Sequence, residues 1–218
     1  GENQVKEIIN TAKTSVFFID EAQKVTWSDV GEISMIEEQA KLAGALVERL
    51  ELTSQFRCSG SDDYMAWLDE TLVVGPGSTH YFSPEKFDFQ IFDSPLEMHN
   101  KIKEKNKVNN KSRVVAGYCW DWISKGNPEA FDIEMPEFGF QAKWNLESRG
   151  SAWIIDPNSV EDIGCIHTSQ GLELDYVGVI IGADLKLVNG VLTTDPAGRA
   201  ATDVSLHGYK KDFKENPE

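Results

Sequence analysis

The sequence predicts an α/β fold with a mainly parallel sheet. Strand-like and helix-like patterns alternate along most of the 218 residues, as they do in chains built from βαβ units. Hydrophobic residues make up 40% of the chain and charged residues 26%, which is typical of a globular protein. A chain of this length can bury a sizeable core and can form one large domain or two small ones.

Helices and strands can be assigned from the spacing of the apolar residues. Helices are predicted over residues 3–12, 33–46 and 64–72, and from Pro95 to about Asn106. The last of these begins with a capping box, Ser94-Pro95-Leu96-Glu97, and the third follows a break with a plausible N-cap at residues 59–62. Strands are predicted over residues 14–19, 50–55, 87–92, 113–118 and 152–155, with a loop at 75–78 and irregular structure over 124–150.

Residues 163–182 combine two apolar strands with an unusually polar turn. The turn is centred on Gln170-Gly171 and is rich in His, Thr, Ser, Gln and Glu. A plain connecting turn needs only Gly, Asn, Asp or Pro. Because ligands bind at the carboxyl ends of strands in open parallel sheets, this turn is a candidate ligand site. The alternative is a polar connection that holds no ligand.

Charge and cysteine content restrict the possible functions. The formal charge of −15 argues against a broad nucleic-acid-binding surface, although it leaves room for a narrow basic groove. Cys58, Cys119 and Cys165 lack metal-ligand spacing, so buried thiols in a reducing cytoplasm are expected. We expect neither a membrane span nor a signal peptide, because no apolar run has the necessary length and the N-terminus is polar.

Charged residues follow two of the predicted strands: an acidic pair after one and an arginine after the other. Asp20 and Glu21 follow an apolar strand, as do the carboxylates with which nucleotide hydrolases hold Mg²⁺ and activate water. Arg57 follows strand 50–55 and could bind a phosphate through two parallel donors. Each has a plain alternative: a strand that leaves the core, and a surface arginine paired with Asp62 or Asp63.

The polar turn and the aromatic residues offer further binding groups. Backbone N–H groups near Gln170 and Gly171 could contact a phosphate, and Glu173 could accept a hydrogen bond from a ribose hydroxyl. His167 and Thr168 could position a phosphate or a nucleic-acid strand, although a single histidine at a strand end is more often structural.

Aromatic side chains cluster in the second half of the chain. Trp120 and Trp122 could stack on nucleic-acid bases, with core packing as the alternative. If residues 120–122 are extended, both rings point to the same face.

The order of these motifs resembles that of superfamily 1 helicase motors. Asp20-x-x-Gln23, Gln55-x-Arg57 and His167-x-x-Gln170-Gly-Leu-Glu173 follow one another along the chain. More narrowly, the sequence resembles the Schlafen group 3-like DNA/RNA helicase family, a bacterial domain of unknown function. The matching stretches cover most of the chain: residues 15–26, 52–69, 118–122, 143–146 and 164–185.

The resemblance implies a fold and a division into domains. The fold would be a RecA-like parallel sheet flanked by helices, of the P-loop NTPase helicase type. Residues 1–49 would form the C-terminal part of the first RecA-like domain, and residues 50–218 the second, with a weakly ordered tail from residue 186.

The resemblance also implies roles for individual residues. Gln23 resembles the glutamine of motif III that senses the γ-phosphate, and Arg57 the arginine of motif IV that contacts it. Gln55 lies in the same nucleotide-facing motif as Arg57. Gly171 and Glu173 resemble the residues of motif V that meet phosphate and ribose.

A competing interpretation concerns Asp20 and Glu21. They would form the Walker B motif, with Asp20 on Mg²⁺ and Glu21 as the base. The short distance in sequence to the arginine motif favours motif III instead.

The sequence departs from the family at two motifs. It contains no phosphate-binding Gly-x-x-x-x-Gly-Lys-Ser/Thr loop, and Arg199 in Ala-Gly-Arg-Ala does not match the family's last motif, Thr-Arg-Gly. The chain is therefore expected to be a piece of a motor that needs the missing N-terminal part. It is expected to be inactive alone and to bind no cofactor tightly, whereas the intact protein would use ATP with Mg²⁺ on DNA or RNA.

Two other functions are open to this sequence. The first is a non-enzymatic module that keeps the RecA-like fold to bind nucleic acid or protein. The second is a metal-dependent nuclease built on Asp20, Glu21, Asp62 and Asp63.

Overall fold

The computed structural model describes residues 3–21, 32–52, 58, 61–72, 83, 85, 87–145, 150–206 and 208–215. The chain divides into two compact units, one made of residues 1–54 and 204–218 and the other of residues 55–203. Gln23, Gln55, Arg57 and the predicted loop at 75–78 lie outside the described residues.

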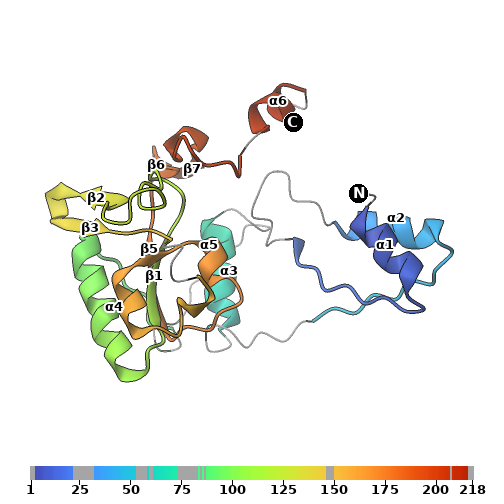
Figure 1. Cartoon of the computed structure of the whole chain (residues 1–218), viewed down its shortest axis with the longest axis horizontal. Coiled ribbons are helices and arrows are strands. Elements are labelled where there is room, and N and C mark those ends of the chain that lie inside the picture. Colours follow the sequence, from blue (N-terminus) through green and yellow to red (C-terminus); the bar gives the residue numbers. More distant parts are fainter. Residues whose placement is uncertain are drawn as a thin grey trace. The chain divides into compact units, whose positions relative to one another are not determined.

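The larger unit is built on a three-stranded parallel sheet in the order β4-β1-β5 (Figure 1). The strands are β1 (Ser112–Ala116), β4 (Ile163–Gly164) and β5 (Tyr176–Ile180). In the central strand, Val114 is paired with Ile163 on one side and with Gly178 on the other. The predicted α/β class with a parallel sheet is therefore confirmed.

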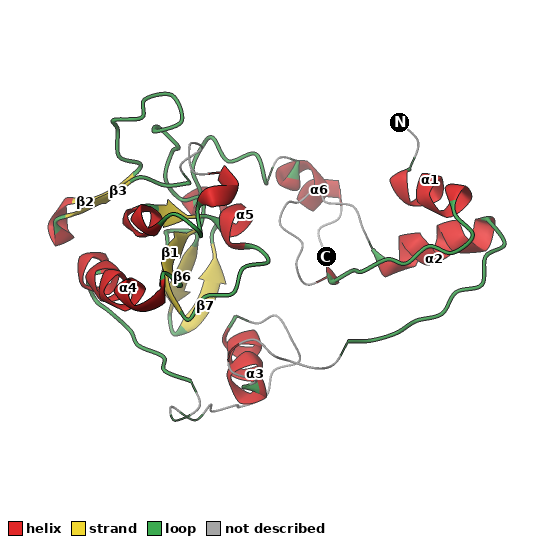
Figure 2. Ribbon diagram, turned by 60° about the horizontal axis from the view of Figure 1, so that its bottom comes forward, coloured by secondary structure: helices red, strands yellow, loops and turns green. Residues whose placement is uncertain are grey.

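Helix α4 (Pro95–Asn109) covers one face of this sheet. The Ser94 hydroxyl accepts a hydrogen bond from the backbone N–H of Glu97 at 3.4 Å, as the predicted cap requires. Asn110 ends the helix in the left-handed conformation with φ 58°, slightly beyond the predicted end. The short helix α5 (Ile166–Ser169) lies on the opposite side of β1 (Figures 1 and 2).

The core of the larger unit lies between the sheet, α4 and a β-hairpin. Its buried side chains include Ile102 of α4, Val114 of β1, and Ile133, Phe140, Trp144 and Ile163. The hairpin consists of β2 (Ile133–Met135) and β3 (Phe140–Ala142), joined through a 3₁₀ turn at Pro136–Phe138. Residues 124–150 were predicted to be irregular, and this hairpin corrects that prediction; strands of three residues are too short to give a clear alternating pattern.

Residues 152–155 do not form the predicted strand, because carbonyl groups of this segment accept hydrogen bonds from a buried arginine of β1. Arg113 of β1 is fully buried, and its guanidinium donates to Asn106 Oδ1 at 2.7 Å and to the carbonyl of Ile154 at 2.9 Å. The segment between two 3₁₀ turns (Gly150–Ala152 and Pro157–Glu161) presents the carbonyl groups of Trp153, Ile154 and Asp156 to this cation. The predicted strand is wrong because these carbonyls satisfy Arg113 rather than a sheet.

A second hairpin follows β5. It consists of β6 (Leu185–Val188) and β7 (Val191–Thr194). Asn189 and Gly190 form its turn with φ values of 52° and 82°, which is the conformation that Asn-Gly favours. A 3₁₀ turn at Pro196–Gly198 follows. The sequence analysis missed this hairpin, although Asn-Gly between two apolar runs is a strong hairpin signal.

Helix α3 (Asp62–Thr71) confirms the third predicted helix. The Ser61 hydroxyl accepts from the backbone N–H of Tyr64 at 3.3 Å and caps the helix within the predicted break. Residues 87–92 are not part of a strand, contrary to the prediction. Their aromatic side chains pack against α3 instead of joining the sheet.

The smaller unit contains α1 (Gln4–Thr11), α2 (Ile33–Leu42) and α6 (Tyr209–Glu215). Helix α2 ends before the predicted residue 46, because Gly44 adopts a left-handed φ of 67°. The strand predicted over residues 14–19 is wrong for the described structure. Val16 and Phe18 are 73% and 87% exposed, and no described strand pairs with this segment.

The strand predicted over residues 50–55 is likewise absent where the structure describes it, at residues 50–52. Among the described helices, none combines the length and the apolar character needed to cross a membrane.

Candidate functional site

The carboxyl edge of the parallel sheet is the candidate site. Because β1, β4 and β5 are parallel, the segments that follow them leave the sheet at the same edge. These segments are residues 117–123, helix α5 with the turn after it, and residues 181–184. Ligands of open parallel sheets bind at this edge.

Helix α5 begins at the end of β4 and is fixed by Thr168. The Thr168 hydroxyl accepts a hydrogen bond from the backbone N–H of Cys165 at 2.7 Å and donates to the Cys165 carbonyl at 3.0 Å. The hydroxyl thus holds the first turn of the helix together. The predicted role of Thr168 in nucleic-acid binding stays a prediction, and it would have to compete with these two bonds.

Helix α5 and the turn after it carry four predicted site residues at the protein surface. His167, Gln170, Gly171 and Glu173 are all exposed. Gly171 has a φ of 80°, and a Cβ atom there would meet no atom within 4 Å. Its left-handed backbone explains why glycine stands at this position. The turn is open to solvent, and the predicted contacts of its residues with a phosphate and a ribose stay predictions.

The ends of β1 and β5 are covered by residues 195–203, which we call the strap. Its backbone is hydrogen-bonded to the segments that follow both strands: Ala200 N–H donates to the carbonyl of Tyr118 at 2.9 Å, and Asp195 N–H to that of Asp184 at 2.7 Å. At Gly198 the strap lies directly on the backbone of Ala183, so that a Cβ atom would overlap it.

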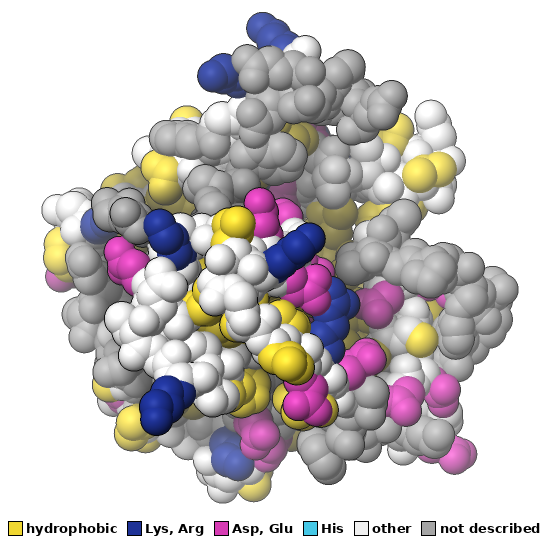
Figure 3. All heavy atoms as spheres, turned by 90° about the vertical axis from the view of Figure 1, so that its right-hand side faces the viewer, with side chains coloured by type: hydrophobic (Ala, Val, Ile, Leu, Met, Phe, Trp, Pro, Cys, Tyr) yellow, Lys and Arg dark blue, Asp and Glu magenta, His cyan; other side chains and the backbone are white. Residues whose placement is uncertain are grey.

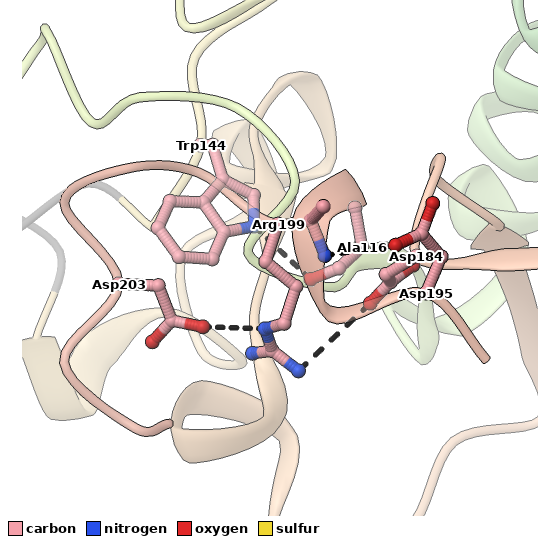
Figure 4. A network of polar contacts seen from close by, with 7 residues as sticks. Ala116, Trp144, Asp184, Asp195, Arg199 and Asp203 are labelled. Carbon is pink, nitrogen blue, oxygen red and sulfur yellow. Dashed lines mark hydrogen bonds and ion pairs between the residues drawn. The ribbon is translucent and has the colours of Figure 1, made fainter. Parts of the chain in front are cut away.

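Arg199 fastens the strap through two carboxylates (Figure 4). Its Nε donates to Asp203, whose side chain is 4% exposed, and its Nη1 lies 3.8 Å from Asp184. In the same strap, the Thr202 hydroxyl is hydrogen-bonded to the hydroxyl of Tyr118 and to Asp121, each at 3.0 Å. In the sequence Arg199 was noted only as a mismatch to a motif. Asp203 stands four residues after it, but nothing in the local sequence indicated the contact with Asp184 or those of Thr202 with Tyr118 and Asp121.

Cys119 lies beneath this network. Burial, together with a hydrogen bond to the Asp184 carboxylate, raises the pKa of the Cys119 thiol to about 11. The thiol is therefore neutral at physiological pH and is not suited to act as a nucleophile. Cys119 is half-buried, whereas the sequence led us to expect buried thiols; Cys165 is buried as expected.

Trp120 and Trp122 follow β1 at the same edge and are half-buried. Both pack against the core, and the Trp122 ring meets buried Trp144 edge to face, with 5.8 Å between the ring centroids. Lys125 Nζ lies 4.7 Å from the centroid of the Trp122 ring. Stacking of Trp120 and Trp122 on nucleic-acid bases stays a prediction.

Asp20 and Glu21 belong to the smaller unit. Glu21 Oε1 accepts a hydrogen bond from the backbone N–H of Ile33 at 2.9 Å, so this carboxylate helps to begin α2. Within the described ranges, no three His, Cys, Asp or Glu side chains lie close enough to hold a metal ion. The described residues therefore offer no support for the nuclease alternative, which also requires Asp62 and Asp63.

The surface charge is mixed on the face drawn in Figure 3. Lys and Arg side chains are scattered among Asp and Glu, with hydrophobic side chains between them. The described part of this face shows no continuous basic area of the kind that binds a nucleic-acid backbone broadly.

Comparison with known proteins gives a family and one distant relative. A family model described as Schlafen group 3, DNA/RNA helicase domain, matches residues 1–218. The uncharacterized protein YPL245W of Saccharomyces cerevisiae is 23% identical over 205 residues, which cover 85% of this chain and 44% of that protein. The chain thus spans less than half the length of this relative. No solved structure matches the chain. The match over the whole sequence identifies the chain as a member of the Schlafen group 3 DNA/RNA helicase domain family.

Proposed function

We propose that the chain is part of an ATP-dependent DNA or RNA helicase or translocase of the superfamily 1 type. The observation that carries this proposal is the exposed turn after β4, in a chain that belongs to a helicase domain family. The turn places the backbone of Gly171 and the carboxylate of Glu173 at the sheet edge where nucleotides bind in related architectures. We further propose that the sheet is RecA-like.

The chain supplies only part of the proposed nucleotide site. It lacks a phosphate-binding Gly-Lys-Ser/Thr loop, and the turn at Gly171 is exposed. We propose that ATP with Mg²⁺ binds between this turn and a partner region that carries the missing loop. In that complex Arg57 and Gln23 would contact the γ-phosphate, and the exposed Val16 and Phe18 would be covered by strands of the partner region.

ATP hydrolysis by the chain itself tests the first part of this proposal. The purified chain is expected to release phosphate from ATP no faster than a Glu173→Ala variant, with or without single-stranded DNA or RNA. Turnover clearly above that control would overturn the proposal that the chain needs a partner region.

The second test uses a longer protein that contains this chain and the phosphate-binding loop. There Arg57→Ala is expected to lower kcat by about 10³-fold, because an arginine on the γ-phosphate acts mainly in the transition state. Nucleotide affinity, measured with a fluorescent ATP analogue, should change only a few-fold. Equal losses of affinity and turnover would contradict the assigned role, and absence of ATP hydrolysis in the unmodified longer protein would refute the motor function.

A further inference from the structure

Residues 143–145 run beside β4 and extend the parallel sheet on that side. Trp144 is paired with Ile163 in a parallel bridge. The N–H of Ile163 donates to the carbonyl of Lys143 at 2.9 Å, and the N–H of Asn145 donates to the carbonyl of Ile163 at 2.8 Å. Because this pairing is parallel, the segment leaves the sheet at the same carboxyl edge as the candidate site.

Trp144 holds this segment in place. Its side chain is 4% exposed, and its indole N–H donates to the carbonyl of Ala116 at 3.1 Å. Its backbone N–H donates to the buried carboxylate of Asp132 at 2.7 Å. The next residue, Asn145, therefore continues from a backbone that is bound on several sides. Groups that follow such a rigid segment are accurately placed.

Asn145 connects this rigid segment to helix α5. Its backbone is left-handed, with a φ of 51°. Its side-chain amide oxygen accepts a hydrogen bond from the thiol of Cys165 at 3.2 Å. Cys165 is 3% exposed and is the residue at which α5 begins. The bond thus reaches from the edge of the sheet to the start of a helix 20 residues further along the chain.

Helix α5 is consequently held at its start from two directions. Thr168 binds the backbone of Cys165 from within the helix, and its hydroxyl lies 3.8 Å from the Cys165 sulfur. Asn145 binds the same sulfur from the neighbouring segment. The helix has only four residues and leads directly into the exposed turn with Gly171 and Glu173. The orientation of α5 therefore sets the direction in which this turn faces.

We propose that Asn145 is a positioning residue of the candidate nucleotide site. It acts through Cys165, by holding the start of α5 and with it the turn at Gly171 and Glu173. The nucleotide part of this inference rests on the proposed function, whereas the hold on α5 is independent of it. The proposal also gives a role to residues 143–146, a stretch that resembles the helicase family and has no part in the proposed function.

A plainer explanation of Asn145 lies in its backbone, since Asn is enriched wherever φ is positive. Asn189 in the turn between β6 and β7 is such a case: its φ is 52°, and its side chain forms no hydrogen bond with the residues that the structure describes. Replacing either residue with Gly keeps the left-handed backbone and removes only the side chain. Asn189→Gly is therefore the matched control for Asn145→Gly.

Hydrogen exchange of the whole chain, followed by mass spectrometry, tests the hold on α5. The amides to follow lie in residues 168–172, whose N–H groups form the hydrogen bonds of α5 and of the turn after it. Asn145→Gly should speed their exchange about fivefold, because one hydrogen bond to α5 is lost. Asn189→Gly should leave them unchanged. Asn145→Asp keeps an acceptor oxygen for the thiol and should restore most of the protection.

Two results of this measurement would overturn the proposal. The first is a natural exchange rate over residues 168–172 in Asn145→Gly. The second is an equal acceleration in β1 and β5, which would show a general loss of stability instead of a local one.

Cys165→Ala tests whether Asn145 acts through the thiol. This variant alone should speed exchange of the same amides, and adding Asn145→Gly to it should change little further, because both remove one interaction. Fully additive effects would show that Asn145 acts on α5 by another route and would contradict the assigned one.

The nucleotide part is tested in the longer protein that carries the phosphate-binding loop. Asn145→Gly should raise KM for ATP about fivefold and leave kcat nearly unchanged, because the turn is proposed to hold the nucleotide. Asn145→Asp should recover most of this loss, and Asn189→Gly should show none. An unchanged KM beside faster exchange of α5 would overturn the nucleotide part. Absence of ATP hydrolysis in the unmodified longer protein would refute the motor function and this part together, whereas hydrogen exchange still decides the hold on α5.

Discussion

The candidate site has two parts: the sheet edge over β1 and β5, which other residues of the chain cover, and the turn at Gly171, which is exposed to solvent. We call them the closed end and the open end. Over β1 and β5, the strap closes the sheet edge with backbone hydrogen bonds and the ion pairs of Arg199. After β4, the turn at Gly171 and Glu173 is exposed, and no atom lies within 4 Å of a Cβ position on Gly171. One end is a structural part of the unit, and the other is free to meet a ligand.

Carboxylates at the two ends of the site therefore have different surroundings. Asp203 and Glu173 are both carboxylates at the same edge, yet Asp203 is buried against Arg199 and Glu173 faces solvent. A buried carboxylate contributes mainly to stability, whereas an exposed one beside an open turn can contribute to binding. Substitutions at the closed end should therefore change stability, and those at the open end should change function.

The two glycines give the strongest contrast. Gly198→Ala should lower the free energy of unfolding by about 3 kcal/mol, because the new Cβ atom would overlap the backbone of Ala183. Gly171→Ala should cost only about 1 kcal/mol, since its methyl group enters open space and only the left-handed φ is strained. Urea unfolding of both variants measures the difference. Equal costs would mean that the strap does not lie on Ala183 in solution.

The two carboxylates give the next largest contrast. Asp203→Ala leaves the guanidinium of Arg199, which is 28% exposed, without its closest partner, and should cost about 2 kcal/mol. Glu173→Ala should change the free energy of unfolding by less than about 0.5 kcal/mol. Comparing the midpoints of thermal unfolding of the two variants tests this. A destabilising Glu173→Ala would show that the turn is structural.

A further effect concerns the Cys119 thiol beneath the closed end and develops only above pH 9. Its pKa rises from the ordinary value of 9.0 to about 11 in the folded protein. Above pH 9 the thiol ionises in the unfolded chain but stays protonated in the folded one, so stability is lost as the pH approaches 11. The difference in unfolding free energy between the natural protein and a Cys119→Ala variant should accordingly shrink over this range.

Alkylation of the same thiol gives an independent readout of the closed end. Iodoacetamide should modify Cys119 slowly at pH 9, and Asp203→Ala should speed the reaction by loosening the strap. If Cys119 reacts like a free thiol in the natural protein, the closed end is open in solution.

Local signals allowed several elements to be predicted from the sequence. Ser94-Pro95 and Ser61 marked the beginnings of α4 and α3, since capping depends on residues within one turn. The apolar runs of β1, β4 and β5 were recognised because buried parallel strands are apolar along their length. The failures were segments whose partners are distant in sequence or outside the described residues, such as 14–19.

The family, the parallel α/β class and the polar turn around Gly171 could be predicted from the sequence alone, because these depend on local residue patterns and motif order, whereas helix α5 before the turn was not predicted. The folded structure was needed to show which polar residues at the sheet edge are already engaged. Asp184 precedes the hairpin of β6 and β7, whereas Arg199 lies in the strap that follows it, so their pairing depends on how the chain returns to the sheet. The hydrogen bonds of Thr202 with Tyr118 and Asp121 are likewise long-range. Such contacts leave no local pattern, which is why the closed end of the site could not be predicted and the open end could.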